Sequence, residues 1–141
     1  MAYSATVRMS TEPFTCEPLM VVLVDDDESF RSALAETLRE DGHAVLEFAS
    51  AVDVPSLHTL PAVDVVITDY DMPGKNGLAF ADTIHTEHPH VPVILVTALP
   101  TSDLVAQTAV RTYIRLLAKP LNYAELRNVL LGLPGPARTL R

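Results

Sequence analysis

Carboxylates follow two short, mostly apolar runs in this chain. Asp25 and Asp26 come directly after the run 20–24, and Asp69 comes directly after the run 63–68. Carboxylate oxygens suit Mg²⁺, which usually takes one or two of them together with waters and phosphate oxygens. A carboxylate can also attack a phosphoryl group and form an aspartyl phosphate. The two acidic segments therefore predict a divalent-cation site that contains a carboxylate nucleophile.

A hydroxyl and an amine follow two further apolar runs. Thr97 comes directly after the run 91–96, and Lys119 comes directly after the run 113–118. A hydroxyl can donate a hydrogen bond to a phosphoryl oxygen, and an ammonium group can neutralise another oxygen as a point charge. Because phosphoryl transfer depends mainly on positioning and charge stabilisation, these groups would complete a phosphoryl-transfer site.

The elements that must position these side chains alternate along the chain. Short apolar runs are typical of buried strands, and a regular alternation of strands and helices predicts a parallel sheet that is covered on both faces. The right-handed crossover rule then favours a flavodoxin-like (βα)5 fold of the α/β class, with strand order 2-1-3-4-5. We expect strands at 20–24, 43–48, 63–68, 92–96 and 113–118, and helices at 28–40, 51–59, 77–87, 101–111 and 122–132.

This strand order brings the acidic residues together. Sites in open parallel sheets form outside the carboxyl ends of the strands, and the strands that precede Asp25 and Asp69 are neighbours in the predicted order. Taken alone, three consecutive aspartates are more often a solvated turn with a helix cap, and we expect Asp27 to be such a cap. The nearby Asp69 favours metal binding for Asp25 and Asp26.

Two features of the expected helices follow from residue type. The helix at 51–59 is weak, because Pro55 is tolerable only in a first turn. Asn122 is expected to cap the last helix.

The composition limits the class of protein. Hydrophobic residues make up 48% of the 141 residues, which is typical of a globular domain. The formal net charge of −8 disfavours nonspecific binding to nucleic acid or to an anionic membrane. No apolar run approaches the roughly 18 residues that span a bilayer. Cys16 is the only cysteine, which excludes an intrachain disulfide and favours a reducing, cytoplasmic setting.

The ends of the chain differ from its centre. We expect a flexible leader at 1–17, one domain at 18–133 and a tail at 134–141, where Pro-Gly-Pro breaks the pattern. Whether the chain is a complete protein or part of a larger regulator stays open.

The chain resembles the receiver domain of two-component response regulators. The resemblance covers roughly residues 18–133, and the intervals of 44, 28 and 22 residues between the first acid, the second acid, the threonine and the lysine are close to the usual spacing of the family. The matching segments are Val24-Asp25-Asp26, Thr68 to Gly74 with Gly77, Val96-Thr97-Ala98 and Lys119-Pro120.

The resemblance implies a role for each acidic residue. Asp69 would accept the phosphoryl group, and Asp26 would bind Mg²⁺ (or Mn²⁺) directly. Asp25 would act on the metal mostly through water, and Asp71 would contribute its backbone carbonyl.

The resemblance also implies how the phosphoryl group is held and supplied. Thr97 and Lys119 would bind its oxygens, and the bond between Lys119 and Pro120 would be cis. The donor would be a phosphohistidine of a sensor histidine kinase or of a histidine phosphotransfer protein. A receiver is not an enzyme but a phosphoacceptor that assists its own phosphorylation and dephosphorylation. It would signal by contact with a downstream protein or as a phosphorylation-dependent homodimer.

The chain departs from the family pattern near its last strand. Receivers usually carry Tyr or Phe three residues before the lysine, where this chain has Leu116. The small pair expected just before that strand is replaced by Thr112 and Tyr113. The phosphorylation chemistry is thus expected to be intact, whereas the output surface is expected to differ. Tyr113 as a substitute aromatic reporter stays open, although packing is the favoured interpretation.

Histidines gather after the helix expected at 77–87. Clustered histidines such as His85, His88 and His90 can bind zinc. The segment is interrupted by Pro89 and lies far from the acidic residues, so we expect solvated loop residues. His43 and His58 are expected at a strand edge and a helix end.

Two other functions are compatible with parts of the pattern. Asp69-Tyr-Asp71 resembles the nucleophile pair of haloacid-dehalogenase-like phosphatases, but those enzymes place their acidic pair last and this chain places it first. A pseudo-receiver would fold without being phosphorylated and act as an interaction module. The complete set of acids, threonine and lysine argues against it.

Overall fold

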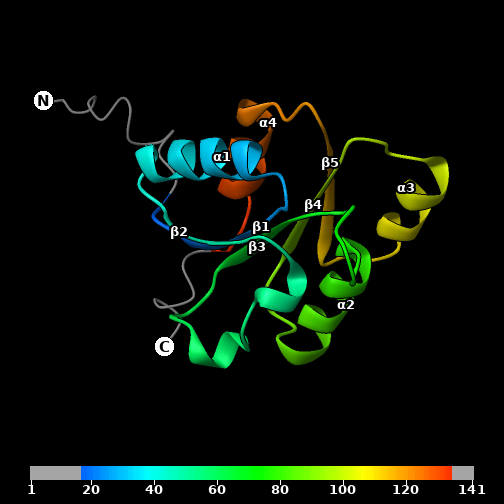
Figure 1. Ribbon diagram of the computed structural model, residues 1–141, viewed down its shortest axis with the longest axis horizontal. Coiled ribbons are helices and arrows are strands. Elements are labelled where there is room, and N and C mark those ends of the chain that lie inside the picture. The colour runs from blue at the N-terminus through cyan, green and yellow to red at the C-terminus, as the bar shows by residue number, and fades with distance from the viewer. Residues whose placement is uncertain (1–16, 135–141) are drawn as a thin grey trace, which may run out of the picture.

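Five parallel strands form the centre of the computed structural model, which describes residues 17–134 (Figure 1). The strand order is β2-β1-β3-β4-β5, as the crossover rule predicted. The strands are β1 (Met20–Val24), β2 (Ala44–Phe48), β3 (Val65–Asp69), β4 (Val93–Thr97) and β5 (Ile114–Ala118). The expected leader at 1–17 and tail at 134–141 lie almost entirely outside the described residues.

Helices cover both faces of this sheet. In Figure 1, α1 and α4 lie on one side of the strands, and α2 and α3 lie on the other. Among residues 17–134 none of the helices has the length and apolar character needed to cross a bilayer. The α-helices of this part of the chain are α1 (Glu28–Glu40), α2 (Gly77–Glu87), α3 (Ser102–Ala109) and α4 (Tyr123–Leu131).

The side chains of each strand alternate between two apolar layers. In β1, Val21 and Leu23 pack with α1 and α4, whereas Val22 and Val24 pack with α2 and α3. Successive side chains of a strand point to opposite faces, so a strand that is apolar at every position must be covered on both. The unbroken apolar runs of the sequence therefore match the three-layer arrangement.

Side-chain caps begin all four of these helices. The Asp27 carboxylate accepts a hydrogen bond from the Phe30 amide at 3.1 Å, and the Asn122 side chain accepts one from the Glu125 amide at 3.2 Å. Asn76 and Thr101 cap α2 and α3 in the same manner. These bonds satisfy amide groups that lack a partner in the first turn. The caps predicted at Asp27 and Asn122 are confirmed.

The helix predicted at 51–59 is wrong. Two short 3-10 turns, η2 (Ala51–Asp53) and η3 (Leu57–Thr59), stand in its place. Pro55 has no amide hydrogen and disfavours helical geometry in the residue before it. Val54 is accordingly extended, with φ of −78° and ψ of 119°. The fold therefore has five strands but only four α-helices in the described part of the chain.

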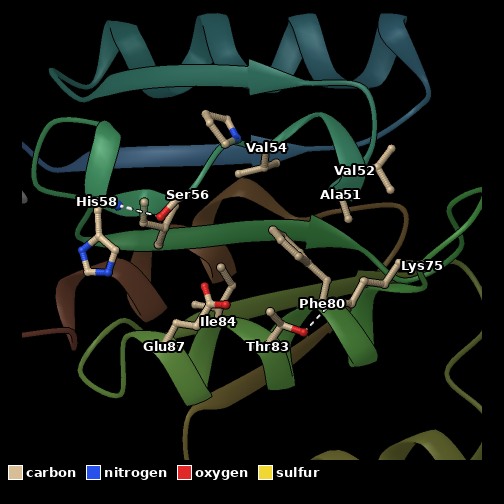
Figure 2. A pocket seen from close by; sticks show the side chains of 12 residues that line it. Ala51, Val52, Val54, Ser56, His58, Lys75, Phe80, Thr83, Ile84 and Glu87 are labelled. Atoms are coloured by element: carbon tan, nitrogen blue, oxygen red, sulfur yellow. Dashed lines mark hydrogen bonds between the residues drawn. The ribbon is translucent and has the colours of Figure 1, made fainter.

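A cavity of about 710 Å³ lies between this irregular segment and α2 (Figure 2). Val54 and Leu57 line one side, and Phe80 and Ile84 of α2 line the other. The short turns leave open the space between this segment and α2.

The strand boundaries place two polar residues inside strands. Asp69 pairs with Val96 as the last residue of β3, and Thr97 pairs with Ala118 as the last residue of β4. The predicted strands at 63–68 and 92–96 ended one residue before Asp69 and Thr97. Both backbones are therefore held by ladder hydrogen bonds, which fixes the side chains more firmly than a loop would.

The prediction of solvated loop histidines is wrong for two of the three. His85 lies within α2, and its ring stacks on Tyr113 with 3.7 Å between ring centroids. His88 follows the helix and is only 8% exposed, whereas His90 is exposed as expected. Tertiary packing, which the local sequence does not specify, buries His88 and partly covers His85.

Candidate functional site

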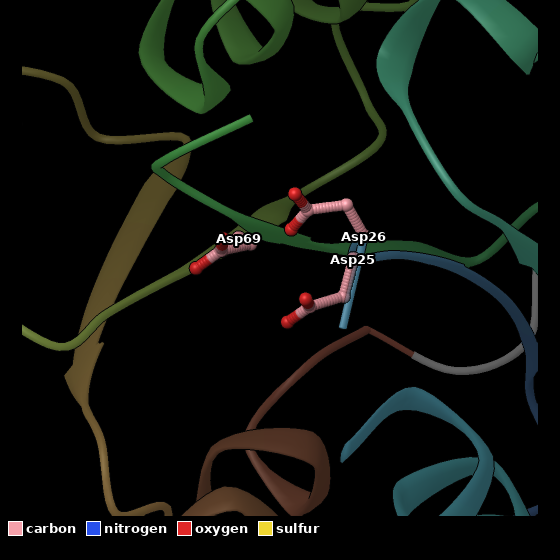
Figure 3. Close-up of side chains that lie close together, drawn as sticks. All are labelled: Asp25, Asp26 and Asp69. Atoms are coloured by element: carbon pink, nitrogen blue, oxygen red, sulfur yellow. The ribbon is translucent and has the colours of Figure 1, made fainter. Parts of the chain in front are cut away.

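Three carboxylates lie together at the carboxyl ends of β1 and β3 (Figure 3). Each of Asp25, Asp26 and Asp69 offers an oxygen within 4.8 Å of the others, and residues 17–134 hold no other such group of three acidic, His or Cys ligands. Asp25 and Asp69 are buried, whereas Asp26 is exposed. The convergence predicted from the strand order is thus found.

The Lys119 ammonium joins two of these carboxylates. Its Nζ lies 3.0 Å from Asp25 Oδ2 and 3.3 Å from Asp69 Oδ1. It also lies 4.4 Å from the centroid of the Phe30 ring, a favourable position for a cation. Phe30 was not among the site residues predicted from the sequence. Its contact with a residue 89 positions away depends on how α1 crosses the sheet, which no local signal reveals.

Asp25 is the most firmly held of the three acids. Its Oδ1 accepts from the Asp27 amide at 2.9 Å, and its Oδ2 accepts from Lys119. Its backbone carbonyl accepts from Arg31 Nη1 at 2.7 Å, a partner that the sequence did not indicate. Both carboxylate oxygens are therefore already engaged, which suits an indirect role toward a cation better than a direct one.

The site is electrostatically crowded. Burial, and then the nearby charge of Asp25, raise the pKa of Asp69 to about 6, although Lys119 opposes the shift. Burial alone would lower the pKa of Lys119, but its bonds with Asp25 and Asp69 raise it. One ammonium group thus faces several carboxylates, and a bound cation would relieve the repulsion among them.

This donor set fits Mg²⁺. The ion takes oxygen ligands at close to octahedral geometry, and the acids supply carboxylate oxygens from two adjacent strand ends. Asp26 is exposed, so water can complete the coordination. Asp71 lies in the exposed loop after β3, close enough that its charge also raises the pKa of Asp69. The role predicted for the Asp71 carbonyl stays a prediction.

Thr97 ends β4, the strand that pairs with β3. The hydroxyl oxygen of Thr97 accepts a hydrogen bond from the Leu99 amide at 3.1 Å, which leaves the hydroxyl its own proton to donate. The Lys119 amide donates to the Thr97 carbonyl at 2.8 Å, so the ends of β4 and β5 are joined. The peptide bond between Lys119 and Pro120 is cis, as the resemblance implied.

Gly77 allows α2 to begin close to the end of β3. A side chain at this position would clash with the backbone carbonyl of Asp69 and with the backbone of Tyr70. The Gly77 amide instead donates to the Tyr70 carbonyl at 2.8 Å. Glycine at this position therefore lets the loop after Asp69 turn tightly.

The region where the sequence departs from the family pattern is well packed. Leu116 is half-buried among the apolar side chains under α2 and α3. The Tyr113 ring stacks on His85, and its hydroxyl donates to Asp82 Oδ1 at 2.5 Å. These contacts agree with the favoured interpretation of Tyr113 as a packing residue.

Comparisons with known proteins agree with this geometry. A model of the response regulator receiver domain matches residues 21–131. The chain belongs to this family. Receivers are signalling modules and are generally not classed as enzymes. The family binds Mg²⁺ at an acidic pocket, and the cluster of Asp25, Asp26 and Asp69 is consistent with that pocket.

Several curated relatives are longer than this receiver. It is 34% identical over 120 residues to response regulator protein FleR of Pseudomonas aeruginosa, an alignment that covers 82% of this chain and 25% of FleR. It is 34% identical over 103 residues to the DNA-binding transcriptional regulator NtrC of Klebsiella pneumoniae, covering 73% of this chain and 22% of NtrC. The chain therefore spans about a quarter of the length of these relatives.

Solved structures share the fold. A response regulator receiver protein from Pseudomonas putida superposes with a TM-score of 0.74 at 23% identity, covering 80% of this chain and 95% of that one. The signal receiver domain of an HD domain-containing protein from Pseudomonas fluorescens superposes with a TM-score of 0.71 at 25% identity, covering 82% and 92%.

Proposed function

We propose that this receiver accepts a phosphoryl group on Asp69 from a phosphohistidine, with Mg²⁺ or Mn²⁺ held by Asp25, Asp26, Asp69 and the Asp71 carbonyl. The observation that carries the proposal is the position of Asp69. It is the last residue of β3, it lies beside two further carboxylates, and its Oδ1 is 3.3 Å from the Lys119 ammonium. A nucleophile, an acidic cation pocket and a positive charge meet there at one strand end.

The transfer is a substitution at phosphorus. A carboxylate oxygen of Asp69 forms the new O–P bond, while the P–N bond to the donor histidine breaks and its electron pair returns to the imidazole nitrogen. The cation, when bound, offsets the repulsion between the anionic nucleophile and the anionic phosphoryl group. Lys119 neutralises one phosphoryl oxygen, and the Thr97 hydroxyl donates to another.

The contacts of the surrounding residues support these roles. Phe30 and Asp25 hold Lys119 beside Asp69, so its ammonium need move little to reach a phosphoryl oxygen. Leu99 fixes the Thr97 hydroxyl through its amide. The same groups would act on a water molecule that hydrolyses the aspartyl phosphate, and in this sense the receiver assists both its phosphorylation and its dephosphorylation.

Partners follow from the chemistry of the donor. A sensor histidine kinase or a histidine phosphotransfer protein would supply the phosphoryl group in the cytoplasm. The receiver would then signal through protein contact, with a downstream target or with a second copy of itself. The DNA-binding activity named for NtrC is not transferred to this chain, since the chain matches only 22% of that protein.

The first test is the intact mass of the chain after incubation with acetyl phosphate. We expect a gain of about 80 Da, the mass of one HPO₃ group on a carboxylate, that requires Mg²⁺ and is abolished by EDTA. Asp69→Ala should remove the adduct. Asp103→Asn, which changes an exposed aspartate on α3, is the matched control and should keep it.

Two outcomes would contradict the proposal. Absence of an adduct over a rapidly quenched time course, with Mg²⁺ binding measured separately, would favour a pseudo-receiver. Steady release of phosphate from a small phosphate ester would favour the alternative hypothesis of a haloacid-dehalogenase-like phosphatase.

A further inference from the structure

Three histidines from two separate segments line one cavity of about 340 Å³. His58 belongs to η3, and His88 and His90 lie between α2 and β4. The cavity also touches the residues just before β3 and β4, so it lies at the opposite edge of the sheet from the acidic site. The remaining lining residues are apolar: Leu57, Leu60, Ala62, Val63 and Val91. Imidazole nitrogens are therefore the side-chain groups that a polar ligand would meet there.

His88 is the buried member of these three histidines. It is 8% exposed, and its Nε2 is buried without a hydrogen-bond partner among residues 17–134. Its backbone is fixed, because its amide donates to the Ile84 carbonyl at 2.7 Å and its carbonyl accepts from the Val91 amide at 3.0 Å. A buried polar nitrogen without a partner is unfavourable, and native proteins rarely leave one without a reason.

His58 lies against this unpartnered ring. The centroids of the His58 and His88 rings are 4.6 Å apart, and the rings are tilted by 58°. His58 is exposed at the junction with the larger cavity beside α2, where Figure 2 shows its ring. The two rings thus come from segments 30 residues apart and meet only because the turns at 51–59 fold against the end of α2.

The charge state of His88 suits a ligand. Burial lowers the pKa of its imidazole, and the neighbouring His58 and His90 lower it further, against the opposing charge of Glu87. A neutral imidazole has a lone pair on one nitrogen and is the form that binds a metal.

We propose that His58, His88 and His90 bind a zinc-class transition-metal ion in this cavity. The His58 and His88 rings already pack against each other. The nitrogens of the three rings do not all lie within 4.8 Å of one another, so binding requires the exposed His58 and His90 side chains to rotate toward His88. Three imidazole nitrogens with water in a fourth position is a known coordination of Zn²⁺.

The two edges of the receiver would then select different ions. Imidazole nitrogens favour Zn²⁺ and its neighbours, whereas carboxylate and carbonyl oxygens favour Mg²⁺ and Mn²⁺. An ion at the histidines would also tie the irregular segment at 51–59 to the loop after α2. The larger cavity shares Leu57 and His58 with the histidine cavity, so its wall would become more rigid.

The test is a calorimetric titration of Zn²⁺ into the full chain in the presence of excess Mg²⁺. Asp69→Asn and Cys16→Ser are introduced together to weaken competing carboxylate and thiolate sites. We expect one Zn²⁺ per chain, with affinity reduced at least about tenfold by His90→Gln and by His88→Gln. His85→Gln is the matched control, because His85 lies in the last turn of α2, three residues before His88, but does not line the cavity, and this variant should bind zinc normally.

A second measurement keeps the test decisive if His88→Gln does not fold. His90 is exposed, so His90→Gln should fold, and Co²⁺ bound to the histidines should give visible absorption bands that this variant loses. Zinc affinity that is equal in the parent and in His90→Gln would overturn the proposal. So would a titration that detects no zinc binding once the acidic and thiolate sites are weakened.

Discussion

The carboxyl group of Asp69 is charged at neutral pH in surroundings that disfavour its charge. Burial and the charge of Asp25 raise its pKa to about 6, and Lys119 offsets only part of this effect. The ionised form is nevertheless the one that can attack phosphorus. The metal-free receiver therefore holds Asp69 in a charged state that a bound cation would stabilise.

A stability measurement can detect the free-energy cost of this buried charge. The pKa of Asp69 is about 6 in the folded chain against a reference of 3.8, so the folded state binds more protons between these values. The contribution of Asp69 to stability is then full below pH 3.8 and is lost as the pH rises through 6, by on the order of 3 kcal/mol. In EDTA at pH 7, Asp69→Asn should unfold at higher urea concentration than the parent, and the difference should shrink near pH 4.

The control for this prediction is Asp103→Asn, which removes the same charge from an exposed position on α3. This variant should show no pH-dependent gain in stability against urea. If Asp69→Asn were instead less stable than the parent at both pH values, the ion pair between Lys119 and Asp69 would outweigh the crowding.

At the scale of elements, one cluster connects α2 to the start of β5. Asp82 on α2 accepts from Arg111 Nε at 2.9 Å, from Arg111 Nη2 at 3.1 Å and from the Tyr113 hydroxyl. The hydrogen bond from Arg111 lowers the pKa of Asp82 most, and the bond from Tyr113 lowers it further, although partial burial opposes the shift. The stacking of Tyr113 on His85 adds an aromatic contact to the same connection. The junction between α3 and β5 is thus fastened to α2.

Two substitutions would measure what this cluster contributes. Tyr113→Phe keeps the ring and removes one hydrogen bond, and we expect a loss of about 1 kcal/mol in unfolding free energy. Arg111→Ala should cost a similar amount, because the carboxylate it binds is 40% exposed and water screens the pair. Urea denaturation checks both values.

Arg115→Ala, at an exposed position of β5, is the comparison and should change stability by less than about 0.5 kcal/mol. Phosphorylation by acetyl phosphate should continue in Tyr113→Phe, since the cluster lies away from the acidic residues. If neither Tyr113→Phe nor Arg111→Ala changed the unfolding free energy, the cluster would not stabilise the junction between α3 and β5.

Local sequence signals predicted some elements and missed others for identifiable reasons. The caps at Asp27 and Asn122 were predictable because a cap depends on one side chain and the amides two or three residues later. The helix at 51–59 failed because Pro55 and the extended residue before it outweigh the surrounding apolar pattern. The burial of His88 depends on a segment 30 residues away.

At the scale of the whole molecule, topology explains why the site was predictable. The order β2-β1-β3-β4-β5 follows from connection handedness and puts the carboxyl ends of β1, β3 and β4 side by side. Any polar residue at those ends must then converge. The contacts of Phe30 and Arg31 with the site were not predictable, because they depend on the angle at which α1 crosses the sheet rather than on strand order.

Cation binding should connect the site to the stability of the entire fold. An ion that binds only the folded chain stabilises it by about 2.7 kcal/mol at a concentration one hundred times its dissociation constant. Asp25 and Asp69 come from adjacent central strands, so unfolding destroys the acidic group. We expect Mg²⁺ to raise the midpoint of thermal unfolding in a concentration-dependent manner, and EDTA to reverse the effect.

Asp26→Asn makes this last prediction specific. Asp26 is exposed, so its substitution should leave the metal-free stability within about 0.5 kcal/mol while it weakens the response to Mg²⁺. Asp103→Asn should keep the full response. If Mg²⁺ stabilised the parent and Asp26→Asn equally, the ion would be acting elsewhere on this acidic surface. Loss of the response in Asp26→Asn alone would tie the stability of the folded chain to the carboxylates that surround Asp69.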